Sequence, residues 1–178
     1  MMPRKLGHTM LVGALVALAV PAAAQDFRLG GGLALPRGGS GSIGGQAQAS
    51  IELGPQTSGV GVRLDLLYAQ TSAPALSLAD AVSAGQVSRT YAAAGGLFYR
   101  REIRDVAPYL LAGGGAYGQT ASAGVSLGVH GGVGVDWPGT RTRPFMEARI
   151  HRLRGDAGSV ALQRRERSLI SALVGLRF

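Results

Sequence analysis

The last eleven residues of the chain, 168–178, have the sequence SLISALVGLRF. Counting back from the C-terminal residue, every second position is apolar, and this face consists of Phe178, Leu176, Val174, Ala172 and Ile170. A period of two indicates a β-strand. An apolar edge strand invites pairing and aggregation in water, so a strand of this kind is atypical of a soluble protein.

Seven further segments with this period, separated by turn residues, precede the terminal strand. The eight expected strands are 26–35, 45–53, 59–70, 86–101, 108–119, 124–137, 144–154 and 168–178. Alternating segments of about ten residues are typical of transmembrane barrels, and an even count places both termini on one side. The sequence therefore predicts an all-β fold, an eight-stranded antiparallel up-and-down transmembrane β-barrel, formed by residues 25–178 as a single domain.

Residues 1–24 have the features of a secretory signal peptide. Arg4 and Lys5 precede an apolar run at 10–20, and three alanines at 22–24 form a small-residue cleavage site. The apolar run is shorter than the roughly 20 residues of a transmembrane helix. We therefore expect a cleaved leader, export from the cytoplasm, and membrane spans built from strands.

The composition limits the function classes that need to be considered. The chain of 178 residues has no Cys, which excludes disulfides and thiolate metal sites. Its net charge is +8, and without the expected leader sixteen Arg face ten acids. Because these Arg residues are spread over nearly every segment rather than gathered in one patch, nucleic acid is not an expected partner.

Aromatic residues fall near the ends of the expected strands. Two aromatic rings at the rims are typical of a bilayer interface, because Tyr and Trp combine an apolar body with a polar tip. The residues predicted to lie at the membrane interface are Phe27, Tyr68, Tyr91, Tyr99, Tyr109, Tyr117, Trp137 and Phe178. A soluble, lipocalin-like barrel is the competing interpretation, and it would keep its apolar side inward.

If the apolar faces meet lipid, the opposite faces meet inside the barrel. The polar network predicted there comprises Arg28, Glu52, Arg63, Asp65, His130, Glu147, Arg149 and His151, and the same faces carry Gln46, Gln48, Ser50, Ser126, Asp136 and Arg177. Eight strands leave an interior that side chains fill, and unpaired buried charges are costly. We therefore expect Glu52, Asp65 and Glu147 to bridge Arg63, Arg149 and Arg28. Replacement of Glu147 by Ala is then expected to lower thermal stability. The inward glycines make room for these side chains or, alternatively, for a thread of water.

The terminal strand ending in Phe, the alternation and the aromatic rings together resemble the small outer-membrane barrels of the OmpX, OmpA-barrel and opacity-protein group. The resemblance implies an integral outer-membrane protein whose last strand is the signal for the barrel-assembly machinery. Some small barrels modify lipid A, and the deacylase type carries a His-x-Ser pair. Here His130 precedes Gly131-Gly132 and His151 precedes Arg152-Leu153, so that pair is absent.

Three hypotheses follow for the function. The first is a non-enzymatic structural or surface-interaction barrel with a plugged lumen, without catalytic residues, cofactor or metal. The second is a narrow porin-like channel, for which the inward glycines are the support, and the third, less favoured, is a lipid A-modifying enzyme.

Outer-membrane lipid is the expected partner. The long connections 36–44, 71–85 and 155–167 are expected outside, where Arg164, Arg165 and Arg167 could hold lipopolysaccharide phosphates. Arg100, Arg101 and Arg104 are expected at the periplasmic rim.

Overall fold

The computed structural model describes residues 25–37, 42–72, 87–120, 122–137 and 142–154 and, at the end of the chain, 167–178. The predicted leader and much of the three long connections lie outside these residues. The described chain is all β, and its strands form a closed antiparallel barrel in sequence order, from β1 to β8, with β8 paired to β1. Among the described residues, no helix is long and apolar enough to cross a membrane.

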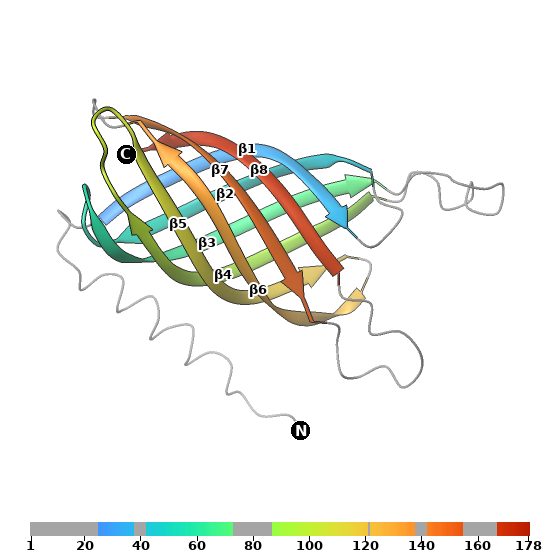
Figure 1. The fold of residues 1–178 in the computed structure, drawn as a ribbon. Coiled ribbons are helices and arrows are strands. Elements are labelled where there is room, and N and C mark those ends of the chain that lie inside the picture. The colour runs from blue at the N-terminus through green and yellow to red at the C-terminus, as the bar shows by residue number, and fades with distance from the viewer. Residues whose placement is uncertain (1–24, 38–41, 73–86, 121, 138–141, 155–166) are drawn as a thin grey trace, which may run out of the picture.

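The eight strands agree with the predicted segments to within two residues at each end. Their bounds are β1 Gln25–Arg37, β2 Gly44–Leu53, β3 Gly59–Ser72, β4 Val87–Arg100, β5 Ala107–Gln119, β6 Ser122–Asp136, β7 Arg143–Leu153 and β8 Arg167–Arg177. Figure 1 shows them tilted steeply around the barrel axis. The fold class and the up-and-down order predicted from the alternation are confirmed.

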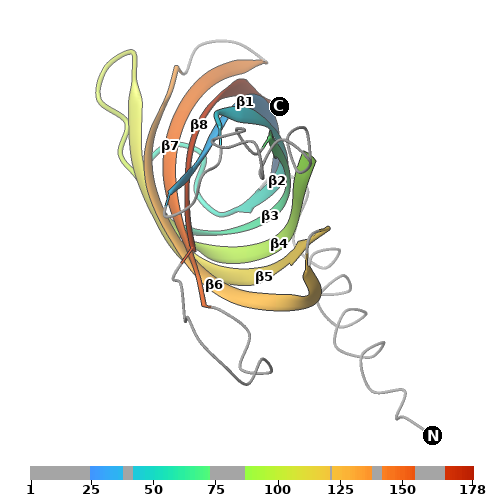
Figure 2. The same ribbon diagram turned by 90° about the vertical axis from the view of Figure 1, so that its right-hand side faces the viewer.

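The two ends of the barrel differ in their connections. Figure 1 places the start of β1 and the C-terminus at one end, which we call the terminal rim; the opposite end is the far rim. The short turns 54–58 and 101–106 lie at the terminal rim, as do Trp137 and Thr142, the described ends of the β6–β7 connection. The turn 101–106 is extended by a bridge between Ile103 and Val106, with Arg104 in the left-handed region at a φ of 55°. Viewed along the axis in Figure 2, the strands form a closed ring.

Side chains alternate strictly between the two faces of the wall. The outer face is apolar, and its exposed large residues include Leu29, Leu33, Leu64, Leu66, Leu97, Leu110, Leu127, Val129, Val133, Met146, Ile150 and Val174. In contrast, buried charged side chains point into the barrel interior, the lumen. This arrangement reverses that of a soluble barrel, which buries its apolar face, and it matches a barrel whose outer face meets lipid.

Candidate functional site

The lumen holds all eight residues of the predicted polar network. Arg28, Glu52, Arg63, Asp65, His130, Glu147, Arg149 and His151 are each 5% exposed or less. Each lies on the inward face of its strand because the strands have the expected alternation. The candidate site is therefore the interior of the barrel, and its chemistry depends on how these groups meet.

Ion pairs cross the lumen from one wall to the opposite wall. The Arg63 guanidinium on β3 lies 2.6 Å from a Glu147 carboxylate oxygen on β7, and Asp65 on β3 lies 2.8 Å from Arg149 on β7. In a ring of eight strands, β3 and β7 are diametrically opposed. Arg63 also bridges Asp65 at 2.8 Å, and Arg149 bridges Glu147. Side chains therefore span the lumen at this level.

A second group of ion pairs lies nearer the terminal rim, around Glu52. This carboxylate lies 2.7 Å from Arg28 and 2.5 Å from Arg100. Two further guanidinium groups, those of Arg63 and Arg177, approach it at 3.5 and 3.6 Å. Glu52 therefore contacts four arginines and joins the terminal-rim group to the β3–β7 bridges.

Asp26 and Asp136 complete the terminal-rim group. Asp136 lies 3.0 Å from both Arg28 and Arg100, and Asp26 accepts a hydrogen bond from Arg177. The described lumen then contains five buried arginines and five buried carboxylates: Arg28, Arg63, Arg100, Arg149 and Arg177 with Asp26, Glu52, Asp65, Asp136 and Glu147. The charges balance, which limits the desolvation cost of burying them. The predicted network of eight residues omitted four of these ten, Asp26, Arg100, Asp136 and Arg177, although Asp136 and Arg177 were expected on the inward faces.

The position of Arg100 corrects one prediction. It was expected to share an exposed periplasmic cluster with Arg101 and Arg104, but it is fully buried. As the last residue of β4 it faces inward, and its guanidinium stacks over the Phe98 ring at 4.8 Å. Arg101 and Arg104 are exposed in the following turn. Of the outer cluster, Arg164 and Arg165 lie outside the described residues, and only the backbone of Arg167 is described.

The interface position is wrong for two of the predicted aromatic residues. Tyr109 and Tyr117 are 2% and 1% exposed and point into the lumen, whereas Tyr91 and Tyr99 are each 49% exposed on the outer face. Among the other predicted interface residues, Phe27, Trp137 and Phe178 are exposed and Tyr68 is half-buried.

The hydroxyl groups explain the inward position of these tyrosines. Tyr109 accepts a hydrogen bond from Arg28 and donates one to Glu147, each at 2.7 Å, and so links β1, β5 and β7. The Tyr117 hydroxyl lies 3.0 Å from His151 Nδ1. With Tyr109 included, every one of the eight strands contributes a side chain to the network.

Inward glycines accommodate the aromatic rings of the lumen. A Cβ atom on Gly30 would approach the Phe145 ring to 2.9 Å, and one on Gly134 would collide with the Tyr109 ring. Gly61 faces Phe98 in the same way. The space beside these three glycines is therefore taken by rings, which weakens the argument for a thread of water and hence for a channel.

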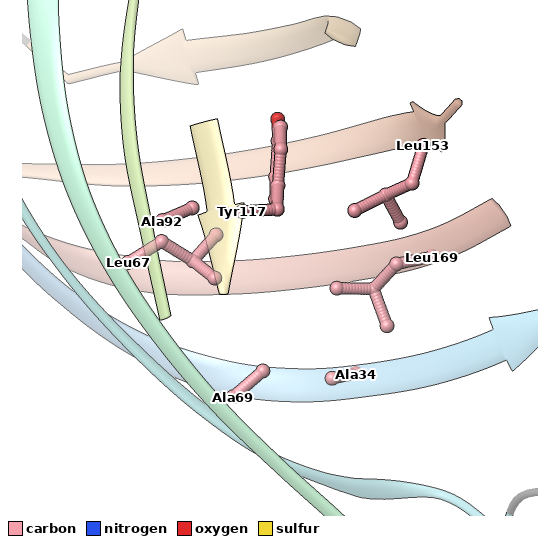
Figure 3. Packing of buried hydrophobic residues seen from close by; sticks show 7 residues of the cluster. All are labelled: Ala34, Leu67, Ala69, Ala92, Tyr117, Leu153 and Leu169. Carbon is pink, nitrogen blue, oxygen red and sulfur yellow. The ribbon is translucent and has the colours of Figure 1, made fainter. Parts of the chain in front are cut away.

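The lumen changes character toward the far rim. His130 and His151 pair across β6 and β7, with ring centroids 5.6 Å apart. Beyond them, side chains from six strands form an apolar cluster, which Figure 3 shows: Ala34, Leu67, Ala69, Ala92, Tyr117, Leu153 and Leu169. We call this set the far-rim apolar cluster. Within the described residues, no group of three or more His, Cys, Asp or Glu side chains could hold a metal ion.

Comparison with solved structures identifies proteins of the same architecture. The structure is similar to that of Neisserial surface protein A (NspA), with a TM-score of 0.61 and 16% sequence identity; the match covers 86% of this chain and 96% of that chain. The chain has the fold of the small eight-stranded outer-membrane barrels. It is also similar to the outer membrane enzyme PagL, with a TM-score of 0.53 and 11% identity over 87% of this chain and 99% of that chain.

At these identities the likeness shows the fold alone. No family model matches the chain. A comparison with the curated proteins finds no match either. What distinguishes this barrel must therefore be inferred from its own residues.

Proposed function

We propose that the protein is an integral outer-membrane barrel with a closed lumen, and that it acts through its outer surface and loops in a structural or surface-interaction role. The observation that carries this proposal is the pair of ion bridges between β3 and β7, which cross the lumen from wall to wall. A barrel closed by its own side chains has its outer face, rims and loops left for contact with partners.

The location in the membrane is supported by the outer face. Large apolar side chains are exposed on all eight strands, a surface that water would not tolerate without association. The predicted leader lies in residues 1–24, outside the described residues, and its cleavage is part of the proposal. The C-terminal strand β8, which ends next to Phe178, is proposed as the segment that the barrel-assembly machinery recognises.

Catalysis is not part of this proposal. PagL demonstrates that an enzyme can be built on the fold. In the present chain, however, both described histidines point into the lumen, where they are 5% and 1% exposed. Neither imidazole can reach a lipid on the outer face, so the described residues offer no histidine base for acyl-ester hydrolysis there.

The channel hypothesis is the second candidate in principle, but the geometry does not favour it. Aromatic rings occupy the space beside Gly30, Gly61 and Gly134, three of the inward glycines on which it was founded. The ion pairs that cross the lumen contain no excess charge of one sign, whereas an ion-selective pathway is lined by such an excess.

Heat-modifiability in gels tests the proposed membrane barrel. The full chain is expressed in a Gram-negative host, the outer membrane is extracted with detergent, and boiled and unboiled samples are compared. We expect a fast-migrating unboiled band that shifts on boiling, and a mature N-terminus at Gln25. Recovery as a soluble periplasmic protein, with a single unshifted band, would contradict the proposal.

A further inference from the structure

Among the residues that the structure describes, exposed arginines lie near the far rim and, at the terminal rim, in the turn 101–106. In the described residues the far-rim set consists of Arg37 on β1, Arg89 on β4, and Arg152 and Arg154 at the end of β7, all exposed. The exposed acids of the described chain, Glu102 and Asp105, lie in the β4–β5 turn at the other rim. The far-rim end of the described outer face therefore has a positive charge that no described carboxylate neutralises.

Strand register brings two of these arginines into one row. Arg37 on β1 pairs with Ser168 on β8, and Ser168 pairs in turn with Arg152 on β7. Paired residues point to the same face of a sheet, and adjacent strands lie about 4.8 Å apart, so the two arginine Cα atoms are roughly 10 Å apart. Both flexible side chains can converge on one group above Ser168, whose hydroxyl lies between them. Guanidinium groups suit phosphate oxygens, which they bind in bidentate geometry.

An apolar groove lies below this row, on the same strands. Its volume is about 570 Å³, and on the outer face it is lined by Leu33, Val133, Met146, Ala148, Ala172 and Val174. The row Leu33–Ala172–Ala148–Val133 crosses four paired strands, with the two small side chains in the middle. Ala172 is four residues from Ser168, or about 13 Å along the strand. The two alanines thus form the floor of a depression that lies about 13 Å below the arginines, within reach of an acyl chain whose head group is at the arginines.

We propose that this face of the barrel, formed by β1, β8, β7 and β6, binds lipid A of the outer leaflet. One lipid A phosphate lies between Arg37 and Arg152 over Ser168, and an acyl chain lies in the groove over Ala148 and Ala172. This inference rests on the proposed outer-membrane location. Charge complementarity selects the occupant. The positive row lies above an apolar groove, and a phosphorylated lipid likewise has its phosphate above its acyl chains.

A second groove on the outer face provides an internal control. A groove of about 580 Å³ lies over β1 to β4, where Leu66, Tyr68 and Tyr91 face Ala47 and Ala93. Where β3 and β4 reach the far rim, the described residues include one exposed arginine, Arg89, and its paired residue on β3 is Gln70, so no second arginine lies in its row. A groove of similar size below a row with one arginine should hold a phosphorylated lipid less tightly than a groove below a row with two.

Native mass spectrometry of the detergent-solubilised full-length product, titrated with purified lipid A, tests the proposal. The double variant Arg37→Gln/Arg152→Gln is expected to bind lipid A about tenfold more weakly or worse, because it loses two charge-assisted contacts. The matched variant Arg89→Gln is expected to bind like the wild type. Dephosphorylated lipid A should bind the wild type as weakly as lipid A binds the double variant.

A groove variant, Ala172→Trp, tests the acyl-chain half of the site. It leaves both arginines in place, and its lipid A affinity is expected to fall because the indole fills the groove. Equal affinity of wild type and double variant would overturn the proposal, as would equal binding of dephosphorylated lipid A or of phosphatidylglycerol. All variants are checked for heat-modifiability. A variant that still shows the gel shift but has lost lipid A binding tests the lipid site, whereas absence of the gel shift in the wild type would contradict the membrane-barrel proposal itself.

Discussion

The two ends of the lumen are filled by different chemistry. Along the inward face of β7, from the terminal rim, the residues are Phe145, Glu147, Arg149, His151 and Leu153. Along this face, an aromatic ring is followed by two charged groups, then by an imidazole, and finally by a leucine. Thus the terminal-rim end is held by ion pairs, and the far-rim end is held by apolar packing.

The difference shows that a barrel lumen can be closed in two ways at different costs. Ion pairs must offset the desolvation of every charge, and they do so only if each charge keeps its partners. Apolar packing needs no partners, but it depends on filling the space without voids. The charged end should therefore be sensitive to loss of one group, and the apolar end to loss of volume.

The largest effect is expected at Glu52. The variant Glu52→Gln leaves Arg28 and Arg100 without the carboxylate that lies 2.7 and 2.5 Å from them. Breaking a buried pair on one side costs about 3–5 kcal/mol, and Glu147→Ala should be destabilising for the same reason. The measurement is the urea midpoint of the gel shift in detergent. The control, Glu102→Gln in the exposed turn, should change stability by no more than about 0.5 kcal/mol; equal midpoints for the two variants would disprove the role of the network.

A smaller effect is expected in the far-rim apolar cluster. Leu67→Ala removes a buried side chain on β3 and should cost about 2–3 kcal/mol through lost burial and the remaining cavity. Its neighbour Leu66 points outward, so Leu66→Ala is a control of identical composition. The control should be less destabilised, because detergent or lipid occupies the vacated volume. The same unfolding titration compares them, and a larger loss for Leu66→Ala would mean that the cluster does not stabilise the barrel.

The smallest effects are expected from two hydroxyl deletions that compare the ends directly. Tyr109→Phe removes bonds to Arg28 and Glu147 and should cost about 2 kcal/mol, since bonds to charged groups are the stronger ones. Tyr117→Phe removes the contact with His151 and should cost about 1 kcal/mol. The order of the two unfolding midpoints is the result to be checked. A reversed order would show that the ionic end is not the more tightly coupled one.

The fold and most lumen residues could be predicted because their strands have one apolar and one polar face. In β3, for example, Arg63 and Asp65 alternate with Val62, Leu64 and Leu66, so the charged residues had to share the inward face. The same reasoning places Glu147 and Arg149 of β7 inside. An error of one residue in the predicted start or end of a strand does not change which residues share a face.

The remaining features could not be predicted because the local sequence pattern does not show which face of the strand points into the lumen. Neither face of β5 carries a charged residue, and both consist mainly of apolar residues and Gly, so the alternation around Leu110 and Ala112 does not tell which face Tyr109 and Tyr117 take. Only the network partners on β1 and β7 decide it. Arg100 ends its strand beside exposed Arg101, and the far-rim apolar cluster has inward leucines that resemble outward ones. These positions depend on contacts between side chains of different strands across the barrel, and the periodicity of a single strand gives no information about such contacts.

The closed lumen is tested most directly by recording from single molecules of the wild-type barrel in a planar lipid bilayer. The barrel must first be shown to be inserted and heat-modifiable, so that silence is not mistaken for lack of insertion. With Arg63–Glu147 and Asp65–Arg149 joining opposite walls, we predict no discrete conductance steps in potassium chloride at any applied voltage that the bilayer survives. Reproducible steps from a folded wild-type barrel would contradict the closed lumen and restore the channel hypothesis.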